Sequence, residues 1–176
     1  GTMGPMTSPD AAPAPVLLRV ADGVGTVTLN RPDAMNSLDL QTKEVLVSVV
    51  AQVAADPEIR CVVLTGAGRA FCAGQDLKEH IEGLKSGDEG LGATVRAHYN
   101  PVALALATMD KPVVAAINGV AAGAGASMAM AADFRIMVDT AGMNLAFAGI
   151  ALSCDTGSSF WLPRLVGMAK AKELLL

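Results

Sequence analysis

Short apolar runs alternate with amphipathic segments along the chain, and this pattern predicts an α/β domain. Apolar residues occupy 16–20 and 24–29, on either side of an Ala-Asp-Gly turn at 21–23, which is typical of a β-hairpin. From 37 to 55 the apolar positions recur at helical spacing, and Asp-Pro at 56–57 follows, so we expect a helix that ends there. The domain is therefore expected to open with a hairpin and a helix.

Two uninterrupted apolar runs, at 61–65 and 113–117, have the composition of buried strands. Each is followed by a turn rich in glycine and alanine, at 66–74 and 118–125. The order strand, small-residue turn and helix therefore occurs twice. Because turns at the carboxyl ends of parallel strands meet at one edge of a sheet, we expect both turns to converge on one cleft.

The remainder of the chain continues this alternation. We expect helices at 76–84, 94–108, 126–132 and 167–176, a loop at 85–92 and a strand at 134–138. Strands that alternate with helices indicate a sheet with largely parallel pairing. Residues 1–15 have the sequence of an expression scar followed by a disordered Pro- and Ala-rich lead, so we expect the folded domain to span 16–176.

Composition narrows the functional class. The chain is 52% hydrophobic and 17% charged, unlike a disordered protein, and with 3% aromatic residues its core must be built from Ala, Val, Leu and Met around 18 glycines. A net charge of −4 argues against nucleic-acid binding, which needs a concentrated basic surface. Cys61, Cys72 and Cys154 lack the spacing of a disulfide framework or a zinc site and favour reduced thiols in the cytoplasm.

The longest uncharged run, 112–132, has the length of a membrane span. It consists mostly of Ala and Gly, however, and Pro112 and the Asn-Gly pair at 118–119 interrupt it. We therefore expect a soluble strand, turn and helix in this segment and no contact with a membrane.

The two Gly/Ala turns have three possible interpretations. They can simply allow tight turns and close packing. The GxxxGxG spacing at 119–125 follows a strand, as in dinucleotide-binding folds, but it lies late in the chain and Tyr99 is followed by Ala103 where such enzymes place a lysine. The third interpretation uses both turns, because small residues leave backbone N–H groups exposed and two such groups can form an oxyanion hole.

Three segments resemble the enoyl-CoA hydratase/isomerase (crotonase) superfamily. Residues 69–78 (RAFCAGQDLK) resemble its AFxAGxDLK segment, 111–125 (KPVVAAINGVAAGAG) its KPVIAAINGxAxGGG segment, and 30–38 (NRPDAMNSL) its NRPxxxNAL start. The likeness runs from Val16 to the last residue, with the motifs in the family's order. It implies a crotonase-like spiral of ββα units, with the family's C-terminal helices missing from this sequence.

The resemblance also implies a site, residue by residue. The backbone N–H groups of Gln75 and Ala124 would form the oxyanion hole of an acyl-CoA site. The positions that would line the coenzyme A and acyl path are Ala34, Ala73, Asp76, Lys78, Gly123, Ser127 and Phe147. Lys78 would lie near the adenine end, although a solvated helix lysine is an equally good interpretation. No metal ion or redox cofactor is implied, because coenzyme A arrives as part of the substrate.

Departures from the family pattern bear on the reaction. Hydratases of this family use two glutamates, and the matching positions hold Ser127 and Phe147, which cannot act as carboxylate acid or base. Asp155, however, lies in a segment similar to the PDxGG segment of the enoyl-CoA isomerase branch, in which an aspartate moves a proton between carbons. Asp155 could also cap the helix expected near Gly157. A dehalogenase-like nucleophile is a weaker match, because that branch has a tryptophan at the position of Phe147.

The reaction implied by this resemblance is a double-bond shift in an enoyl-CoA. Asp155 would move the proton while the N–H groups of Gln75 and Ala124 hold the dienolate oxygen. The alternatives are water addition, as in a hydratase, and an acyl-CoA-binding paralogue with weak chemistry. The resemblance further implies fatty acid metabolism, a cytoplasmic location and assembly as a homotrimer or a dimer of trimers.

Overall fold

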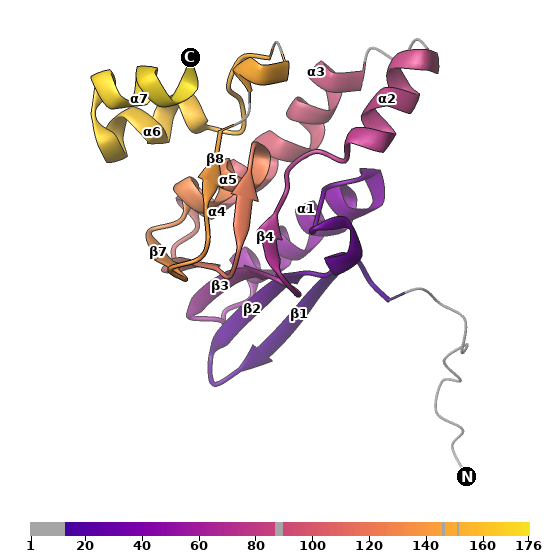
Figure 1. The fold of residues 1–176 in the computed structure, drawn as a ribbon. Helices are drawn as coiled ribbons and strands as arrows, with labels where there is room; N and C mark the ends of the chain where they lie inside the picture. The colour runs from indigo at the N-terminus through magenta and orange to yellow at the C-terminus, as the bar shows by residue number, and fades with distance from the viewer. Residues whose placement is uncertain (1–12, 87–89, 146, 151) are drawn as a thin grey trace.

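The main sheet contains five strands. The computed structural model describes residues 13–86, 90–145, 147–150 and 152–176 (Figure 1). In spatial order the strands are β1 (Val16–Ala21), β2 (Val24–Leu29), β3 (Cys61–Gly66), β5 (Val113–Ile117) and β7 (Phe134–Met137). The hairpin partners β1 and β2 are antiparallel, and every other neighbouring pair is parallel. The predicted α/β class, hairpin and parallel pairing are thus confirmed.

A second, smaller sheet was not predicted. It consists of three short parallel strands, β4 (Ala70–Cys72), β6 (Val120–Ala122) and β8 (Met143–Asn144). The segments 66–74 and 118–125 were predicted to be turns only, and this was wrong, since each contains one of these strands. Small residues make the pairing possible: a Cβ on Gly119 would lie 2.0 Å from the carbonyl oxygen of Arg69.

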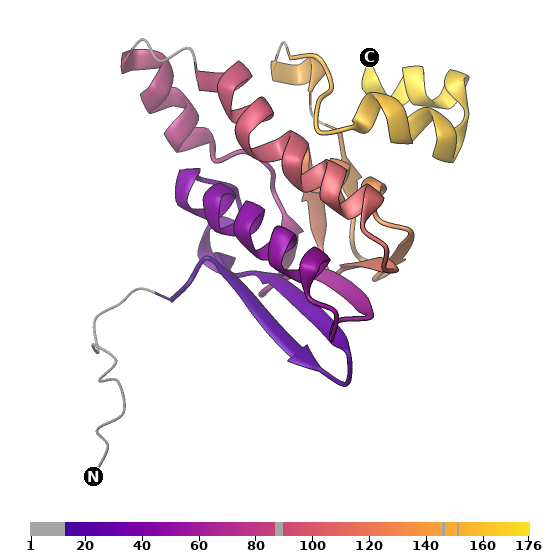
Figure 2. The same cartoon turned by 180° about the vertical axis from the view of Figure 1, so that it is seen from behind.

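The helices of the described residues pack in different places. They are η1 (Pro32–Ala34), α1 (Leu40–Ala55), α2 (Leu77–Ser86), α3 (Gly90–Thr94), the π-helix η2 (Val95–Tyr99), α4 (Asn100–Thr108), α5 (Ala124–Ala131), η3 (Ala148–Ile150), α6 (Ser158–Val166) and α7 (Met168–Leu175). In Figure 2, α1 and the run from α3 to α4 lie side by side in front of the strands. The helices α6 and α7 pack against each other at the opposite end of the molecule from the hairpin (Figure 1).

Helix α1 begins three residues later than predicted. The carboxylate of Asp39 accepts a hydrogen bond from Thr42 N at 2.8 Å and so caps the helix at Leu40. Ser37 was expected inside the helix. It lies instead in an extended segment, because the following residue, Leu38, pairs with a distant part of the chain, as described below.

Other boundaries also differ from those predicted. The expected loop at 85–92 contains the start of α3 at Gly90, while 87–89 lie outside the described residues. The expected helix at 94–108 starts as the π-helix η2 before it continues as α4. Helix α5 begins at Ala124, two residues before the predicted start, and this places Ala124 in its first turn.

The core lies between the main sheet and the helices. Alternate residues of β2 and β3 are buried, so each strand buries one face, and α1 contributes Leu46, Val50 and Val53 to the same cluster. All eight residues of α5 are buried, as its Ala- and Gly-rich sequence allows. By contrast, β7 at the sheet edge is exposed along its whole length.

Two further expectations concern the chain ends and membranes. Within the predicted lead, Ala14 O and Pro15 O accept hydrogen bonds from Asn30, while 1–12 lie outside the described residues. No helix in the described part of the chain is long and apolar enough to cross a bilayer.

Candidate functional site

The two Gly/Ala turns meet beside the paired strands β4 and β6. Gly74, at φ +86°, follows β4, and Gly123, at φ +50°, follows β6. A Cβ on Gly74 would lie 2.8 Å from Ala122 O and 3.5 Å from Ala124 N. Position 74 therefore requires glycine both for its backbone conformation and for this close approach. As a result, the residues that follow these two glycines, Gln75 and Ala124, lie near each other.

The backbone N–H of Gln75 is free to act as a donor. Leu38 pairs with this segment, because Leu38 N donates to Gly74 O at 2.8 Å and Asp76 N donates to Leu38 O at 3.1 Å. Backbone groups alternate in direction along an extended chain, so the N–H of Gln75 points away from Leu38. Within the described residues it donates to no protein acceptor.

The N–H of Ala124 is a second free donor. Ala124 is the first residue of α5, and the first N–H groups of a helix have no acceptor within it. The first helical hydrogen bond runs from Ser127 N to Gly123 O, at 3.0 Å, and Gly123 has no side chain with which to cap the helix. The helix dipole adds partial positive charge at this end. Two backbone donors are therefore present where the turns meet.

Asp155 lies in the segment that leads from η3 to α6. The cap residue of α6 is Gly157, and no side chain caps it, so the predicted capping role of the Asp155 carboxylate is wrong. Ser158 N donates instead to the backbone O of Asp155 at 2.9 Å. The carboxylate accepts one hydrogen bond, from Thr156 Oγ1 at 2.8 Å. Burial raises the pKa of Asp155, and the Thr156 hydroxyl opposes this only partly.

Two serines connect the second turn to the Asp155 segment. The hydroxyl of Ser127 lies 3.0 Å from Gly123 O and 2.5 Å from the hydroxyl of Ser158, which lies 2.7 Å from Asp155 O. Both serines are fully buried. Ser127, predicted to line the acyl path, therefore has its hydroxyl committed to protein groups, and the pair fixes the start of α6 against the start of α5.

Ala34 and Ala73, predicted to line the coenzyme A path, lie on neighbouring segments. Ala73 N donates to Met35 O at 3.0 Å, so the chain after η1 runs beside the first glycine turn. Both alanines are half-buried.

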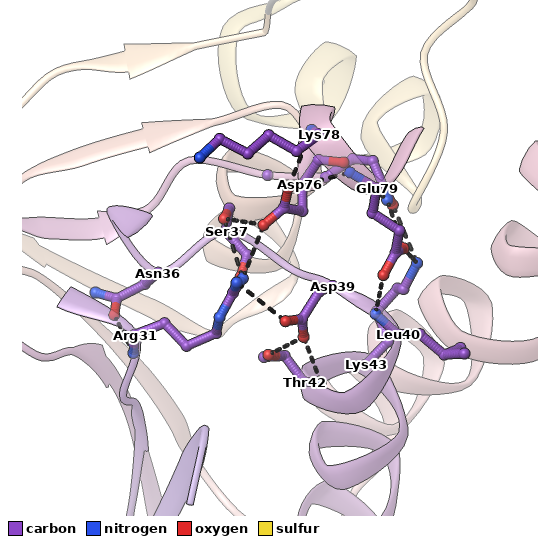
Figure 3. A network of polar contacts seen from close by, with 12 residues as sticks. Arg31, Asn36, Ser37, Asp39, Leu40, Thr42, Lys43, Asp76, Lys78 and Glu79 are labelled. Atoms are coloured by element: carbon purple, nitrogen blue, oxygen red, sulfur yellow. Dashed lines mark hydrogen bonds and ion pairs between the residues drawn. The ribbon is translucent and has the colours of Figure 1, made fainter. Parts of the chain in front are cut away.

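Asp76 has protein partners on both carboxylate oxygens (Figure 3). Oδ2 accepts hydrogen bonds from Arg31 Nη1 and Ser37 Oγ, each at 3.0 Å. Oδ1 accepts from the N–H groups of Lys78 at 3.1 Å and Glu79 at 3.4 Å, in the first turn of α2. Burial acts to raise the pKa of Asp76, but the bonds from Arg31, Ser37 and these N–H groups together lower it. The side chain is therefore occupied within the protein.

Arg31 was not predicted as a functional residue. Its guanidinium lies 3.0 Å from Asp76 and 3.0 Å from Asp39, the two aspartates that begin α2 and α1 (Figure 3). The only sequence signal was its place in the segment at 30–38, which does not reveal its partners.

The other predicted lining residues differ in accessibility. Lys78 is exposed, and its side chain extends away from the polar network in Figure 3. Gly123 is half-buried, and Phe147 is buried. Their roles toward a ligand stay predictions.

An apolar pocket of about 270 Å³ lies between the Asp155 segment and α7. Its lining includes Leu152, Cys154 and Leu175 but neither of the two backbone donors nor Asp155. This pocket is therefore separate from the two backbone donors and from the Asp155 carboxylate. In the described part of the chain, no three His, Cys, Asp or Glu side chains are grouped as metal ligands.

Comparisons with known proteins agree with these features. The enoyl-CoA hydratase/isomerase family model matches residues 19–176. The chain is 44% identical over 161 residues to 1,2-epoxyphenylacetyl-CoA isomerase of Escherichia coli. It is 40% identical over 163 residues to (E)-benzylidenesuccinyl-CoA hydratase of Thauera aromatica. Each alignment covers 92% of this chain and 62% of the relative, so the chain spans less than two thirds of either relative's length.

Solved structures agree as well. An enoyl-CoA hydratase from Bacillus anthracis superposes with a TM-score of 0.78 at 36% identity, covering 92% of this chain and 62% of that one. The predicted crotonase-like spiral is thus confirmed, with β3, β4 and α2 as one ββα unit and β5, β6 and α5 as the next. The fold, the matched motifs and the family model lead to one conclusion: this chain belongs to the enoyl-CoA hydratase/isomerase family.

Proposed function

We propose that this chain shifts a double bond in an enoyl-CoA thioester by moving one proton with Asp155. The observation that supports this most directly is the state of the Asp155 carboxyl, which is half-buried and does not cap α6. Burial also raises its pKa. A carboxyl with a raised pKa is a stronger base and, once protonated, keeps the proton long enough to return it. Ser127 and Phe147 offer no competing carboxylate at the positions of the hydratase glutamates.

The proposed reaction starts from a 3-enoyl-CoA. The Asp155 carboxylate removes a proton from C2, and the electron pair of the broken C–H bond forms a dienolate that extends to the thioester oxygen. The protonated Asp155 then returns the proton to C4, which leaves the double bond between C2 and C3. One proton leaves and one returns, so neither water nor an oxidant is consumed.

The two free backbone donors suit the charge that forms in this reaction. In the dienolate, negative charge gathers on the thioester oxygen, and the N–H groups of Gln75 and Ala124 would donate to it. A single donor of this kind contributes roughly 3 kcal/mol to transition-state stabilisation in other enzymes. Because both donors belong to a fixed backbone, they need little reorganisation when the charge appears.

The coenzyme A part of the substrate is proposed to follow the path predicted from the sequence. Ala34 and Ala73 lie close enough to form one wall of it, and the exposed Lys78 is free to reach the adenine end. Asp76 would line this path by its position, since its carboxylate and its backbone N–H are already bonded to protein groups. Assembly as a homotrimer or a dimer of trimers, a cytoplasmic location, and the lack of a metal or redox cofactor stay predictions.

The test is to replace the carboxylate without changing its size. We expect Asp155→Asn to lower kcat for a 3-enoyl-CoA by about 10²- to 10⁴-fold, the usual contribution of a general acid–base group. The matched control is Asp139→Asn, an exposed aspartate after β7, which should retain wild-type kcat. Full isomerase activity in Asp155→Asn would contradict the proposal.

Hydration is the second candidate, and the 40% identity to (E)-benzylidenesuccinyl-CoA hydratase supports keeping it. Product mass separates the two reactions, because water addition increases the mass of the acyl-CoA and a double-bond shift does not. Binding of an acyl-CoA with no turnover of either a 2-enoyl or a 3-enoyl substrate would instead select the weakly active paralogue.

A further inference from the structure

We propose that Tyr99, Lys43 and Glu79 hold the side-chain amide of Gln75 and thereby fix the direction of its backbone N–H, with Tyr99 as a positioning residue. This inference rests on the proposed use of that N–H as an oxyanion donor. The four residues come from three helices and one extended segment that are distant in sequence. We call the three side chains around Gln75 the amide clamp.

The contacts of the clamp use both ends of the Gln75 amide. Oε1 accepts a short hydrogen bond from the hydroxyl of Tyr99 and lies 3.4 Å from Lys43 Nζ. Nε2 donates to Glu79 Oε1 at 3.2 Å and lies 3.4 Å from the backbone O of Asp76. Since the amide oxygen and the amide nitrogen are both engaged, the side chain cannot turn without breaking several contacts.

Burial shows that the clamp is more than a surface ion pair. Tyr99 and Lys43 are each only 4% exposed. A buried ammonium group costs free energy unless it is paired, and Lys43 Nζ lies 2.8 Å from Glu79 Oε1. The same carboxylate also accepts a hydrogen bond from Leu40 N at the start of α1 through its other oxygen. The clamp thus connects α1, α2 and η2 around one glutamine.

Tyr99 stays a hydrogen-bond donor over the working pH range. Burial, with contributions from Cys72, Asp155 and Glu79, raises the pKa of its hydroxyl above the ordinary value. Tyr99 is also the last residue of the π-helix η2, a rare form of helix that is frequent at functional sites. The hydroxyl that bonds to Gln75 is thus carried by an uncommon local backbone.

The clamp acts on the backbone because the other side of Gln75 is also fixed. The segment is held by Leu38 through hydrogen bonds of 2.8 and 3.1 Å to the neighbouring residues, Gly74 and Asp76. With the amide held on one side and the strand pairing on the other, the peptide plane that carries the N–H has one orientation. Oxyanion donors are effective only when they are oriented before the charge develops.

The experiment is a double-mutant cycle with Tyr99→Phe and Gln75→Ala, both of which leave the backbone N–H in place. Bound 2-butenoyl-CoA with a ¹³C-labelled thioester carbonyl serves as the probe, because hydrogen bonds to that oxygen lower its infrared stretching frequency. We expect each variant to lose about half of this frequency shift. For a 3-enoyl-CoA, we expect about a tenfold loss in kcat, with KM changed less than twofold. The double variant should be no worse than either single one, since Tyr99 acts through Gln75.

The control is Thr108→Val, which removes another hydroxyl from the same helical run. Thr108 Oγ1 bonds to Leu104 O at 2.8 Å, so this variant should keep both the carbonyl frequency and kcat at wild-type values. A wild-type carbonyl frequency in Tyr99→Phe, or additive losses in the double variant, would overturn the clamp. If Tyr99→Phe fails to fold, the half-buried Gln75→Ala carries the same test alone. The carbonyl frequency does not depend on turnover, so it tests the clamp by itself. A failure of the isomerase proposal would appear in the kinetics instead, as full activity in Asp155→Asn or as no isomerisation of a 3-enoyl-CoA.

Discussion

Gln75 and Ala124 each follow a positive-φ glycine of a Gly/Ala turn, but the chain around them differs in kind. The first turn is surrounded by polar side chains: the amide clamp holds Gln75, and Arg31 holds Asp76 beside it. Around the second turn the backbone packs closely, since α5 is wholly buried and Gly125 lies against Cys72. The N–H of Gln75 is oriented by charges and hydrogen bonds, and the N–H of Ala124 by close packing of the backbone around it. Substitutions that remove polar contacts at the first turn and substitutions that disturb packing at the second should therefore affect the protein in different ways.

The largest effect is expected from a methyl group in the close-packed turn. A Cβ on Gly125 would lie 2.3 Å from Cys72 O and 2.7 Å from Cys72 Cβ, so Gly125→Ala must displace α5 or β4. We expect the free energy of unfolding to fall by about 3 kcal/mol, measured by urea denaturation. Gly142→Ala is the control, because a Cβ there meets nothing within 4 Å. Equal stability of the two variants would show that close packing around Gly125 does not stabilise the second turn.

A smaller loss of stability is expected from a substitution of Asp76, beside the first turn. Asp76→Asn weakens the bond to Arg31 and the cap of α2, and we expect a loss of about 2 kcal/mol at neutral pH. Because the pKa of Asp76 is lowered in the folded state, its contribution is present above the ordinary value of 3.8 and is lost as the pH falls through the folded pKa. The difference between wild type and variant should thus shrink in acid.

The control for this variant is Asp110→Asn, at an exposed aspartate after α4, which should change stability by less than about 0.5 kcal/mol. A difference between wild type and Asp76→Asn that stays constant from neutral to acidic pH would contradict a role for the ionised carboxylate.

Removal of the hydrogen bond between Ser127 and Ser158 should reduce stability by a smaller amount again. Ser127→Ala removes the contact to Ser158 and leaves both backbone carbonyls with other donors, so we expect a loss of about 1 kcal/mol by thermal or urea unfolding. Ser159→Ala, an exposed neighbour in α6, is the control and should be neutral. If the two variants match in stability and in kcat, the serine pair does not position Asp155.

The smallest expected effect on stability is the pH dependence contributed by Asp155. Its pKa is raised in the folded state, so its favourable contribution is complete below the ordinary value of 3.8 and is lost as the pH rises through the folded pKa. We expect Asp155→Asn to be slightly more stable than wild type at neutral pH and equal to it in acid. The acid limb of kcat/KM should correspondingly have a midpoint above 3.8 in the wild type. A variant less stable than wild type at neutral pH would contradict this sign.

The strands of the main sheet could be predicted because their signals are local. The apolar run at 113–117 and the glycines after it lie within one short segment. The start of α1 could not be located in the same way. Ser37 and Asp39 are both good capping residues, and the choice depends on the pairing of Leu38 with Gln75, which is a tertiary contact.

The amide clamp and the cap of α6 also could not be predicted from local sequence patterns. Tyr99 donates a hydrogen bond to Gln75, which is 24 positions away. No local sequence pattern predicts the π-helix to which Tyr99 belongs. At Asp155 the residue type favoured a cap, but Thr156 and Gly157 both have positive φ, so the chain turns before the helix begins and the carboxylate is left outside its first turn. Where a function depends on contacts between distant segments, sequence spacing does not identify the partners.

The position of Arg31 between two helix starts has a consequence for the dynamics of the domain. Asp39 begins α1 and Asp76 begins α2, and one guanidinium forms an ion pair with each of them. If either cap opens, Arg31 loses one of the two carboxylates that hold its guanidinium in place, so the first turns of the two helices should open and close as one cooperative unit. Amide protons in these turns should then exchange with solvent at matched rates, although 37 positions separate the two aspartates.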